Sequence, residues 1–134
     1  MRLVNIDHVG IAVQDLDVAL AEYGRQYHVH AEYREVNEEQ GVEEAMLPVG
    51  ASNVQLLQPL SPDTPVGRFL AKRGEGLHHI AFAVPSIDEA LLHLAAEEVE
   101  LIDAHARIGG GGHRIAFVHP RGLAGTLIEL VELQ

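Results

Sequence analysis

The feature that most constrains the fold of this chain is an internal repeat. The phrase IDHVGIAVQDLDVAL at residues 6–20 returns in altered form as LHHIAFAVPSIDEAL at residues 77–91. In each copy a strand-like apolar run leads into a capped amphipathic segment, which predicts helices over 16–27 and 87–98. Strand-like segments follow each helix, at 29–37, 42–49 and 52–59 in the first copy and at 100–108, 113–119 and 124–133 in the second.

Each copy therefore reads as a β-α-β-β-β module that is too small to bury its own sheet face. The modules cover about 3–59 and about 77–133, and a linker at about 60–76, rich in proline and glycine, carries one short helix between them. A chain of 134 residues has the length of one domain. We expect a single α+β domain over 1–134 in which the two modules lie side by side.

Four polar residues occupy repeat-related places on the predicted strands. His8 and His79 align in the first strand of each module, and Gln55 aligns with Glu129 in the last. Side chains alternate between the faces of a strand, and the apolar neighbours of all four must face the helices. The four polar side chains then project from the other face, where small neighbours leave room for a ligand.

This quartet predicts a metal site. Any one of these residues, taken alone, is more simply explained as a hydrogen-bonded or surface side chain. Their common face and their repeat-related positions favour shared ligation, because a buried carboxylate beside two imidazoles needs a positive partner. Imidazole nitrogen with oxygen ligands suits a borderline divalent cation such as cobalt, manganese, nickel, iron or zinc.

A fifth candidate is a glutamate in the strand over 42–49. Ala45 and Leu47 must face the helix, so Glu44 points inward and Glu43 outward. The alternative is that both are exposed charges at the start of a strand. If Glu44 does point inward, it is an unliganded carboxylate near the metal face, which suits a general base.

Composition removes several classes of function. The chain has no cysteine, so disulfides, thiolate ligands and cysteine nucleophiles are excluded. A net charge of −11 disfavours binding to nucleic acid or to an anionic membrane surface. The N-terminus lacks a signal-peptide layout, and no apolar run is long enough to cross a bilayer, so we expect a cytoplasmic protein. The cluster of Arg68, Lys72 and Arg73 suits either a phosphate or a solvated helix face.

Several fragments together resemble a known superfamily. They are DHVGIAV, EEQGVEEAMLPVG, GLHHIAFAV and GGGGHRIAFVHPRGLAGTLIELVE, which cover essentially the whole chain in order. The chain resembles the vicinal oxygen chelate (glyoxalase-like) superfamily and, within it, the methylmalonyl-CoA epimerase family. The resemblance implies an eight-stranded, incompletely closed mixed barrel. Carried over by position, the family's metal ligands fall on His8, Gln55, His79 and Glu129, and its catalytic glutamate falls on Glu44.

The chemistry implied by this resemblance is a 1,1-proton transfer that interconverts (R)- and (S)-methylmalonyl-CoA through a metal-stabilised enolate. Inversion needs a proton removed on one face of the carbon and returned on the other. Glu44 is the candidate for one face, and the resemblance places Glu129 on the other, where a water or another residue is the alternative. The implied partners are a divalent cation of unassigned identity, an acyl-CoA substrate and a second copy in a homodimer.

Two other classes of function share this fold. One is another metal-dependent enzyme, such as a glyoxalase-type isomerase or lyase, which uses a similar quartet; Glu44 within EEQGVEE favours the epimerase. An extradiol dioxygenase, also metal-dependent, uses three ligands and iron, so Gln55 counts against it. The other is a metal-free protein that binds small molecules, which needs no quartet.

His78 points to the opposite face from His79, and we interpret it as structural.

Overall fold

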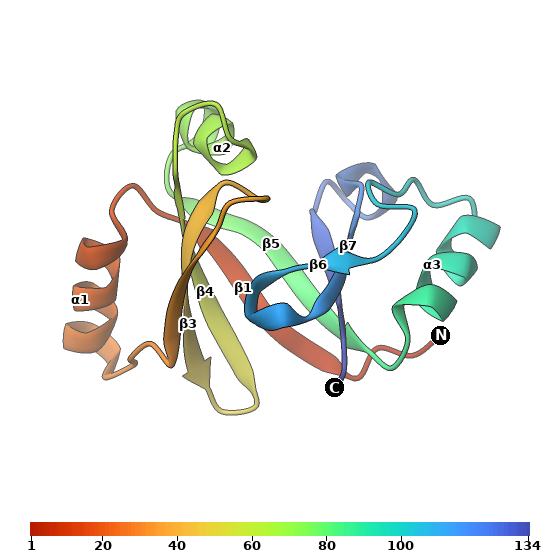
Figure 1. The fold of residues 1–134 in the computed structure, drawn as a ribbon, viewed down its shortest axis with the longest axis horizontal. Coiled ribbons are helices and arrows are strands. Elements are labelled where there is room, and N and C mark those ends of the chain that lie inside the picture. Colours follow the sequence, from red (N-terminus) through yellow and green to blue (C-terminus); the bar gives the residue numbers. More distant parts are fainter. The chain divides into compact units, whose positions relative to one another are not determined.

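The computed structural model describes residues 1–134, which form eight strands, three α-helices and two short 3₁₀ helices (Figure 1). In chain order the elements are β1 (Asn5–Ala12), α1 (Leu16–Tyr27), β2 (Tyr33–Asn37), β3 (Val42–Val49), β4 (Ser52–Pro59), α2 (Pro65–Arg73), β5 (Gly76–Val84), α3 (Ile87–Ala96), β6 (Arg107–Ile108), η1 (Gly110–Gly112), β7 (Arg114–Val118), η2 (Pro120–Gly122) and β8 (Ile128–Glu132).

All eight strands belong to one mixed sheet with the order β2-β3-β4-β1-β5-β8-β7-β6. Strands β5 and β8 pair in parallel, whereas β2 with β3, β3 with β4, β6 with β7 and β7 with β8 pair antiparallel. The order begins at β2 and ends at β6, so the sheet keeps two edges. The predicted α+β class and the eight-stranded, incompletely closed mixed sheet are confirmed.

By its internal contacts the chain divides into two compact units. One consists of Met1–His8 with His79–Gln134, and the other of Val9–His78. The divisions therefore fall inside β1 and β5, immediately after the first candidate histidine ligand and immediately before the second.

In the unit Val9–His78, helix α1 covers one face of β3 and β4 (Figure 1). The helix starts where Asp15 caps it by accepting a hydrogen bond from the backbone N–H of Val18. Its apolar side then packs on the alternate residues of the two strands that face it. The buried residues of this cluster are Val13, Leu16, Ala45, Leu47 and Leu56.

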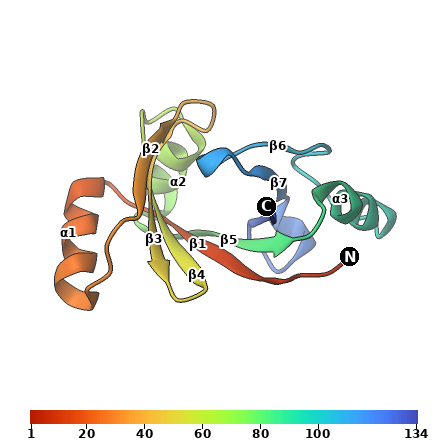
Figure 2. The same ribbon diagram turned by 60° about the horizontal axis from the view of Figure 1, so that its bottom comes forward.

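Helix α2 lies on the other side of these strands (Figure 2). It begins with Thr64 as N-cap and Pro65 in the first turn, where proline costs no hydrogen bond. Its buried residues Val66 and Leu70 pack with Leu57, the neighbour of Leu56 on β4. The alternation along β4 thus assigns the two helices to opposite faces. Glu44 and Gln55 share the α2 face with Leu57, because the register opposes Glu44 to Leu57 and Met46 to Gln55.

In the unit Met1–His8 with His79–Gln134, helix α3 packs on one face of β5, β7 and β8. Ser86 caps this helix by accepting from the N–H of Glu89. The main buried residues on this face are Val84, Ile87, Leu91, Ala116, Ile128 and Leu130. The opposite face holds a smaller cluster of Ala81, Ile115 and Val131, with Phe117 packed against it. Glu129 lies on that second face, because it pairs with both Ala81 and Phe117.

Three predicted strands are clearly shorter than the sequence suggests. Of the segment predicted over 124–133, only Ile128–Glu132 is a strand. The segment predicted over 29–37 becomes a strand only from Tyr33, because His28 ends α1 in a left-handed conformation with φ 55°. The segment predicted over 100–108 keeps two strand residues, Arg107 and Ile108. Much of the remainder is loop, which is anchored where Asp103 accepts a 2.8 Å hydrogen bond from the N–H of Phe117. Helix α1, strands β3 and β4, and a helix within the linker appear where they were predicted.

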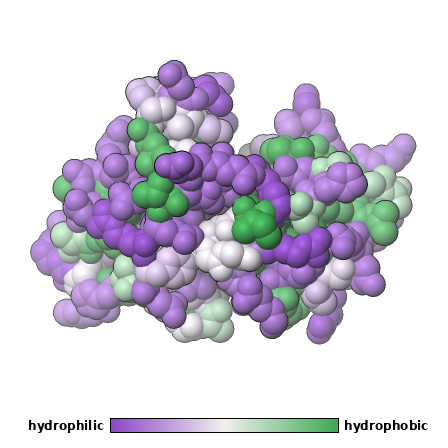
Figure 3. All heavy atoms as spheres, viewed as in Figure 1, coloured by the Kyte–Doolittle hydropathy of each residue, from purple (hydrophilic) through white to green (hydrophobic).

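The face of the molecule drawn in Figure 3 is mostly hydrophilic, with separate small apolar patches. This agrees with the excess of acidic residues in the sequence. Among the helices of the structure, none combines the length and the apolar composition that a membrane span requires.

Candidate metal centre

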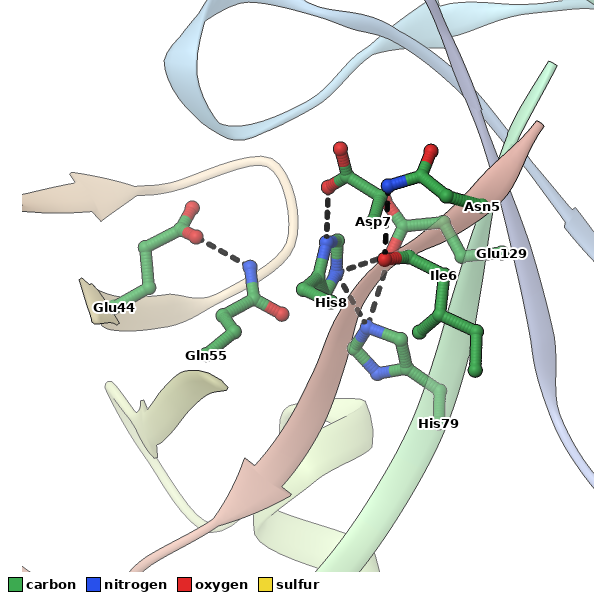
Figure 4. A network of polar contacts seen from close by, with 8 residues as sticks. All are labelled: Asn5, Ile6, Asp7, His8, Glu44, Gln55, His79 and Glu129. Atoms are coloured by element: carbon green, nitrogen blue, oxygen red, sulfur yellow. Dashed lines mark hydrogen bonds and ion pairs between the residues drawn. The ribbon is translucent and has the colours of Figure 1, made fainter. Parts of the chain in front are cut away.

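Three of the predicted ligands meet in the unit Met1–His8 with His79–Gln134 (Figure 4). The Nε2 atoms of His8 and His79 are 3.1 Å apart. Oε2 of Glu129 lies 3.2 Å from Nε2 of His8 and 2.9 Å from Nε2 of His79. The three residues are only 3%, 3% and 5% exposed, respectively. Two nitrogens and one carboxylate oxygen therefore converge in a place that water hardly reaches.

Each of these side chains comes from a different strand. His8 is on β1, His79 on β5 and Glu129 on β8 (Figure 4). The parallel register pairs Glu129 with Ala81, which is two residues beyond His79 and shares its face. The methyl group of Ala81 leaves space between the larger side chains. The ring of Phe117 packs edge-to-face on His79, with ring centroids 5.9 Å apart, and limits solvent on that side.

A second carboxylate contacts His8 from the side away from this cluster. Oδ2 of Asp7 lies 2.7 Å from Nδ1 of His8. Burial by itself lowers the pKa of His8, but hydrogen bonds and charge from Asp7 and Glu129 outweigh it and raise the pKa to about 9. Without a bound cation, His8 is thus an imidazolium at neutral pH, held between two carboxylates.

The opposite shift occurs at Glu129. Burial alone raises the pKa of this carboxyl, but hydrogen bonds and charge from His79 and His8 outweigh it and lower the pKa to about 2. The cluster therefore stabilises a carboxylate beside positive charge. A proton supplies that charge when no metal ion is present, and a divalent cation supplies it more strongly.

The donor set fits a divalent transition metal. The three ligand atoms all lie within 4.8 Å of one another. Imidazole and carboxylate donors bind zinc and similar ions at about 2.0–2.2 Å, so donors that share an ion are separated by about 3 Å. The separations of 2.9 and 3.2 Å fall in that range. Two imidazoles with one carboxylate match the ligand preferences of zinc, cobalt, nickel, iron and manganese.

The other two predicted site residues lie in the unit Val9–His78. Glu44 on β3 is 1% exposed and Gln55 on β4 is 7% exposed. Nε2 of Gln55 donates to Oε2 of Glu44 at 2.5 Å (Figure 4). The amide oxygen of Gln55 is buried and has no hydrogen-bond partner in the protein. An orphaned acceptor of this kind is costly unless a proton donor or a cation meets it.

Glu43 confirms that the two neighbouring glutamates face opposite ways. Oε2 of Glu43 pairs with Arg34 at 3.1 Å, and its side chain is partly exposed. Glu44, one residue further, is buried and bonded to Gln55. The strand alternation that predicted an inward Glu44 and an outward Glu43 therefore describes β3 correctly.

Sequence reasoning missed two residues of this region. Asp7 contacts His8, although adjacent strand residues start on opposite faces and no contact is expected between them. Phe117 contacts His79 from β7, across a sheet register that the sequence does not reveal. The only available signal was the acidic residue directly before His8. His78, by contrast, packs edge-to-face on Phe69 with ring centroids 4.9 Å apart.

Comparison with known proteins gives a consistent assignment. Residues 7–117 match the Glyoxalase/Bleomycin resistance protein/Dioxygenase superfamily. The mitochondrial methylmalonyl-CoA epimerase of Homo sapiens is 33% identical over 130 residues, which cover 96% of this chain and 74% of the human protein.

Two solved structures of methylmalonyl-CoA epimerases are closely similar. A variant of the Streptomyces coelicolor enzyme in complex with 2-nitronate-propionyl-CoA is 44% identical, with a TM-score of 0.95 over 98% of this chain and 95% of that chain. The enzyme from Mycobacterium tuberculosis is 40% identical, with a TM-score of 0.94 over 98% of this chain and 89% of that chain. The chain belongs to the Glyoxalase/Bleomycin resistance protein/Dioxygenase superfamily and, within it, to the methylmalonyl-CoA epimerases, a family of isomerases.

Proposed function

We propose that this protein is a metal-dependent epimerase that interconverts (R)- and (S)-methylmalonyl-CoA by 1,1-proton transfer. The observation that carries the proposal is the convergence of His8, His79 and Glu129 on one point. Membership of the epimerase family supports the substrate, since the structure of the Streptomyces coelicolor relative is a complex with 2-nitronate-propionyl-CoA. The acidic hydrogen of such a substrate lies on the carbon between a thioester and a carboxylate.

The proposed metal ligands are His8, Gln55, His79 and Glu129. The unpartnered amide oxygen of Gln55 supports its inclusion as the fourth donor. A divalent cation held by these residues supplies Lewis acidity toward the substrate oxygens on which negative charge develops. The protein contributes the rest of the site: it fixes the donors on strands and keeps water away from them.

Glu44 is the proposed base on one face of the substrate carbon. It is a buried carboxylate whose hydrogen bond from Gln55 orients one oxygen. Burial excludes water from competing for the proton that the carboxylate takes up. Because the amide of Gln55 donates a hydrogen bond to it, this oxygen of Glu44 acts as an acceptor, which suits the role of a general base.

Glu129 is the proposed acid or base on the other face. Its pKa of about 2 makes it a weak base when no metal is bound. Epimerisation needs one carboxyl to lose a proton while the other gains one, so the two glutamates act as a coupled pair. Removal of either one is therefore expected to slow inversion sharply.

Solvent exchange tests this proposal. The metal-loaded protein is incubated with methylmalonyl-CoA in D₂O, and deuterium at C2 is followed by mass spectrometry or NMR. The wild type is expected to exchange the hydrogen at C2 for deuterium and to epimerise the substrate. Glu44→Gln is expected to lower epimerisation by about 10²–10⁴-fold, because a general base is lost while the shape of the side chain is kept.

Glu43→Gln is the matched control, since it makes the same chemical change one residue away on the opposite face of β3. It is expected to retain the wild-type rate. If the metal-loaded wild type exchanged no deuterium into C2, the proposed epimerase activity would be wrong. Equal rates in Glu44→Gln and Glu43→Gln would remove Glu44 from the mechanism and leave the assignment itself standing.

The proposal also takes the protein to act in the cytoplasm as a homodimer. Size-exclusion chromatography with light scattering tests the dimer directly. A monomeric mass at micromolar concentration, with full epimerase activity, would contradict it.

A further inference from the structure

We propose that Asp7 is a positioning residue for the metal centre: its carboxylate accepts the Nδ1–H of His8 and so presents the Nε2 lone pair of that ring to the ion. The inference rests on the proposed metal centre. It concerns a residue outside the ligand set.

The geometry of His8 carries the argument. Its Nδ1 is 2.7 Å from Oδ2 of Asp7, while its Nε2 faces the other two ligands, 3.1 Å from Nε2 of His79 (Figure 4). A carboxylate only accepts hydrogen bonds, so the ring nitrogen beside it must carry a proton. In a neutral imidazole the proton on one nitrogen leaves a lone pair on the other. The contact with Asp7 thus selects the tautomer that a metal ion requires at Nε2.

Burial adds orientation to this selection. His8 is only 3% exposed, so its ring cannot find water as an alternative partner for Nδ1. The Asp7 side chain is 32% exposed and remains in contact with solvent. A hydrated carboxylate that touches a buried ring holds the ring without the cost of burying a second full charge. This is the arrangement of a carboxylate–histidine–metal triad.

The internal repeat does not repeat the acidic residue itself. The residue that aligns with Asp7 in the second copy is His78, which precedes His79 and packs on Phe69. The corresponding position therefore holds no carboxylate. Only the first copy pairs its histidine ligand with an acidic neighbour in the sequence.

Metal affinity tests the inference without reference to turnover. Asp7→Asn and Asp7→Ala are titrated with Co²⁺ or Zn²⁺ against a chelator of known affinity. Both are expected to bind about 10- to 100-fold more weakly than the wild type, which is the usual cost of removing such a partner. Asp88→Asn is the control, because Asp88 is exposed at the start of α3 and pairs with Arg114. It is expected to bind as the wild type does.

A second readout detects the proton itself. In zinc-loaded protein labelled with ¹⁵N-histidine, the Nδ1–H of His8 is expected to be visible and protected from exchange. Asp7→Ala, which has no acceptor at this place, is expected to lose that protection. A general loosening of the fold would not confine the loss to one ring. If Asp7→Asn fails to fold, Asp7→Ala serves for both measurements, with folding checked by thermal unfolding of the metal-free protein.

The outcomes separate the inference from the proposed function. Wild-type affinity in the Asp7 variants and a protected Nδ1–H in Asp7→Ala would overturn the role of Asp7 and leave the metal centre intact. Equal weakening in Asp88→Asn would overturn it as well, because the effect would then reflect lost negative charge in general. A wild type that binds no divalent cation would instead overturn the metal centre, and this inference with it.

Discussion

The protonation of His8 depends strongly on its neighbours. Its pKa of about 9 in the metal-free fold means that it is charged at pH 8, whereas an unshifted histidine with pKa 6.5 is neutral there. A metal ligand must be the neutral imidazole, so ion uptake has to displace the proton. The pKa of His8 is shifted upward. The proton that a metal ion would displace is therefore fully bound below pH 6.5 and is lost as the pH rises through about 9.

We therefore predict that binding of Zn²⁺ at pH 8 releases about 0.9 proton from His8, against about 0.03 for an unshifted histidine. Calorimetric titrations in two buffers with different ionisation enthalpies measure this number. The release is expected to fall when the titration is repeated at pH 10. A release close to zero at pH 8 would mean that His8 is already neutral before the ion arrives.

At the scale of single residues, the alternation of side chains between the two faces of a strand predicted much of the candidate site. It assigned Glu44 and Glu43 to opposite faces, because that assignment needs only the period of a strand and an apolar neighbour. It did not predict the contact between Asp7 and His8, because side-chain torsions decide whether neighbours on a strand touch. Nor does alternation say how far Gln55 lies from the histidines, so its role as a ligand stays a prediction.

At the scale of helices and strands, patterns within a short segment predict an element correctly when contacts within that segment determine it. Helix α1 begins and ends where the sequence predicts, because an N-cap and an apolar stripe are encoded within a dozen residues. Strand β6 is reduced to two residues, because its length depends on pairing with β7 and on Asp103 binding the backbone of Phe117. Contacts of that kind join residues on different segments, such as Asp103 and Phe117, and the periodic pattern of a single segment does not encode them.

Replacing glycine with alanine is expected to change the stability in opposite directions at two helical positions. A Cβ at Gly67 in α2 would lie 2.4 Å from the carbonyl oxygen of Ser61 and 2.8 Å from that of Pro62. A Cβ at Gly24 in α1 would meet only the exposed ring of His30, at 3.2 Å, which can turn away. Backbone atoms cannot yield in the same way without moving the whole start of α2.

We predict that Gly67→Ala lowers the free energy of unfolding by about 1–3 kcal/mol, since overpacking outweighs the better helix propensity of alanine. Gly24→Ala is expected to raise it by up to about 1 kcal/mol, because the propensity gain is then not opposed. Urea unfolding followed by circular dichroism measures the free energy of unfolding of both variants. The comparison holds when the variants and the wild type have equal m-values. Stabilisation by Gly67→Ala would show that the segment before α2 relaxes freely.

On the scale of the whole chain, the candidate metal centre joins distant parts of the sequence. Its three residues in contact stand at positions 8, 79 and 129 on three strands, and they can meet only when the sheet is formed. The unfolded chain offers no such arrangement, so an ion that binds here binds the native state. Its binding free energy is therefore added to the stability of the fold.

We predict that Co²⁺ or Zn²⁺ at 100 times its dissociation constant raises the free energy of unfolding by about 2.7 kcal/mol, and that a chelator abolishes the increase. The chain has 20 acidic residues and a net charge of −11, so cations also gather on its surface. Measurements in about 0.15 M salt screen that background. His79→Asn separates the two effects, because it removes one donor and leaves the surface charge unchanged. The increase should be largely lost in this variant; an equal increase in His79→Asn and wild type would place the stabilising ion on the acidic surface and not among the three strands.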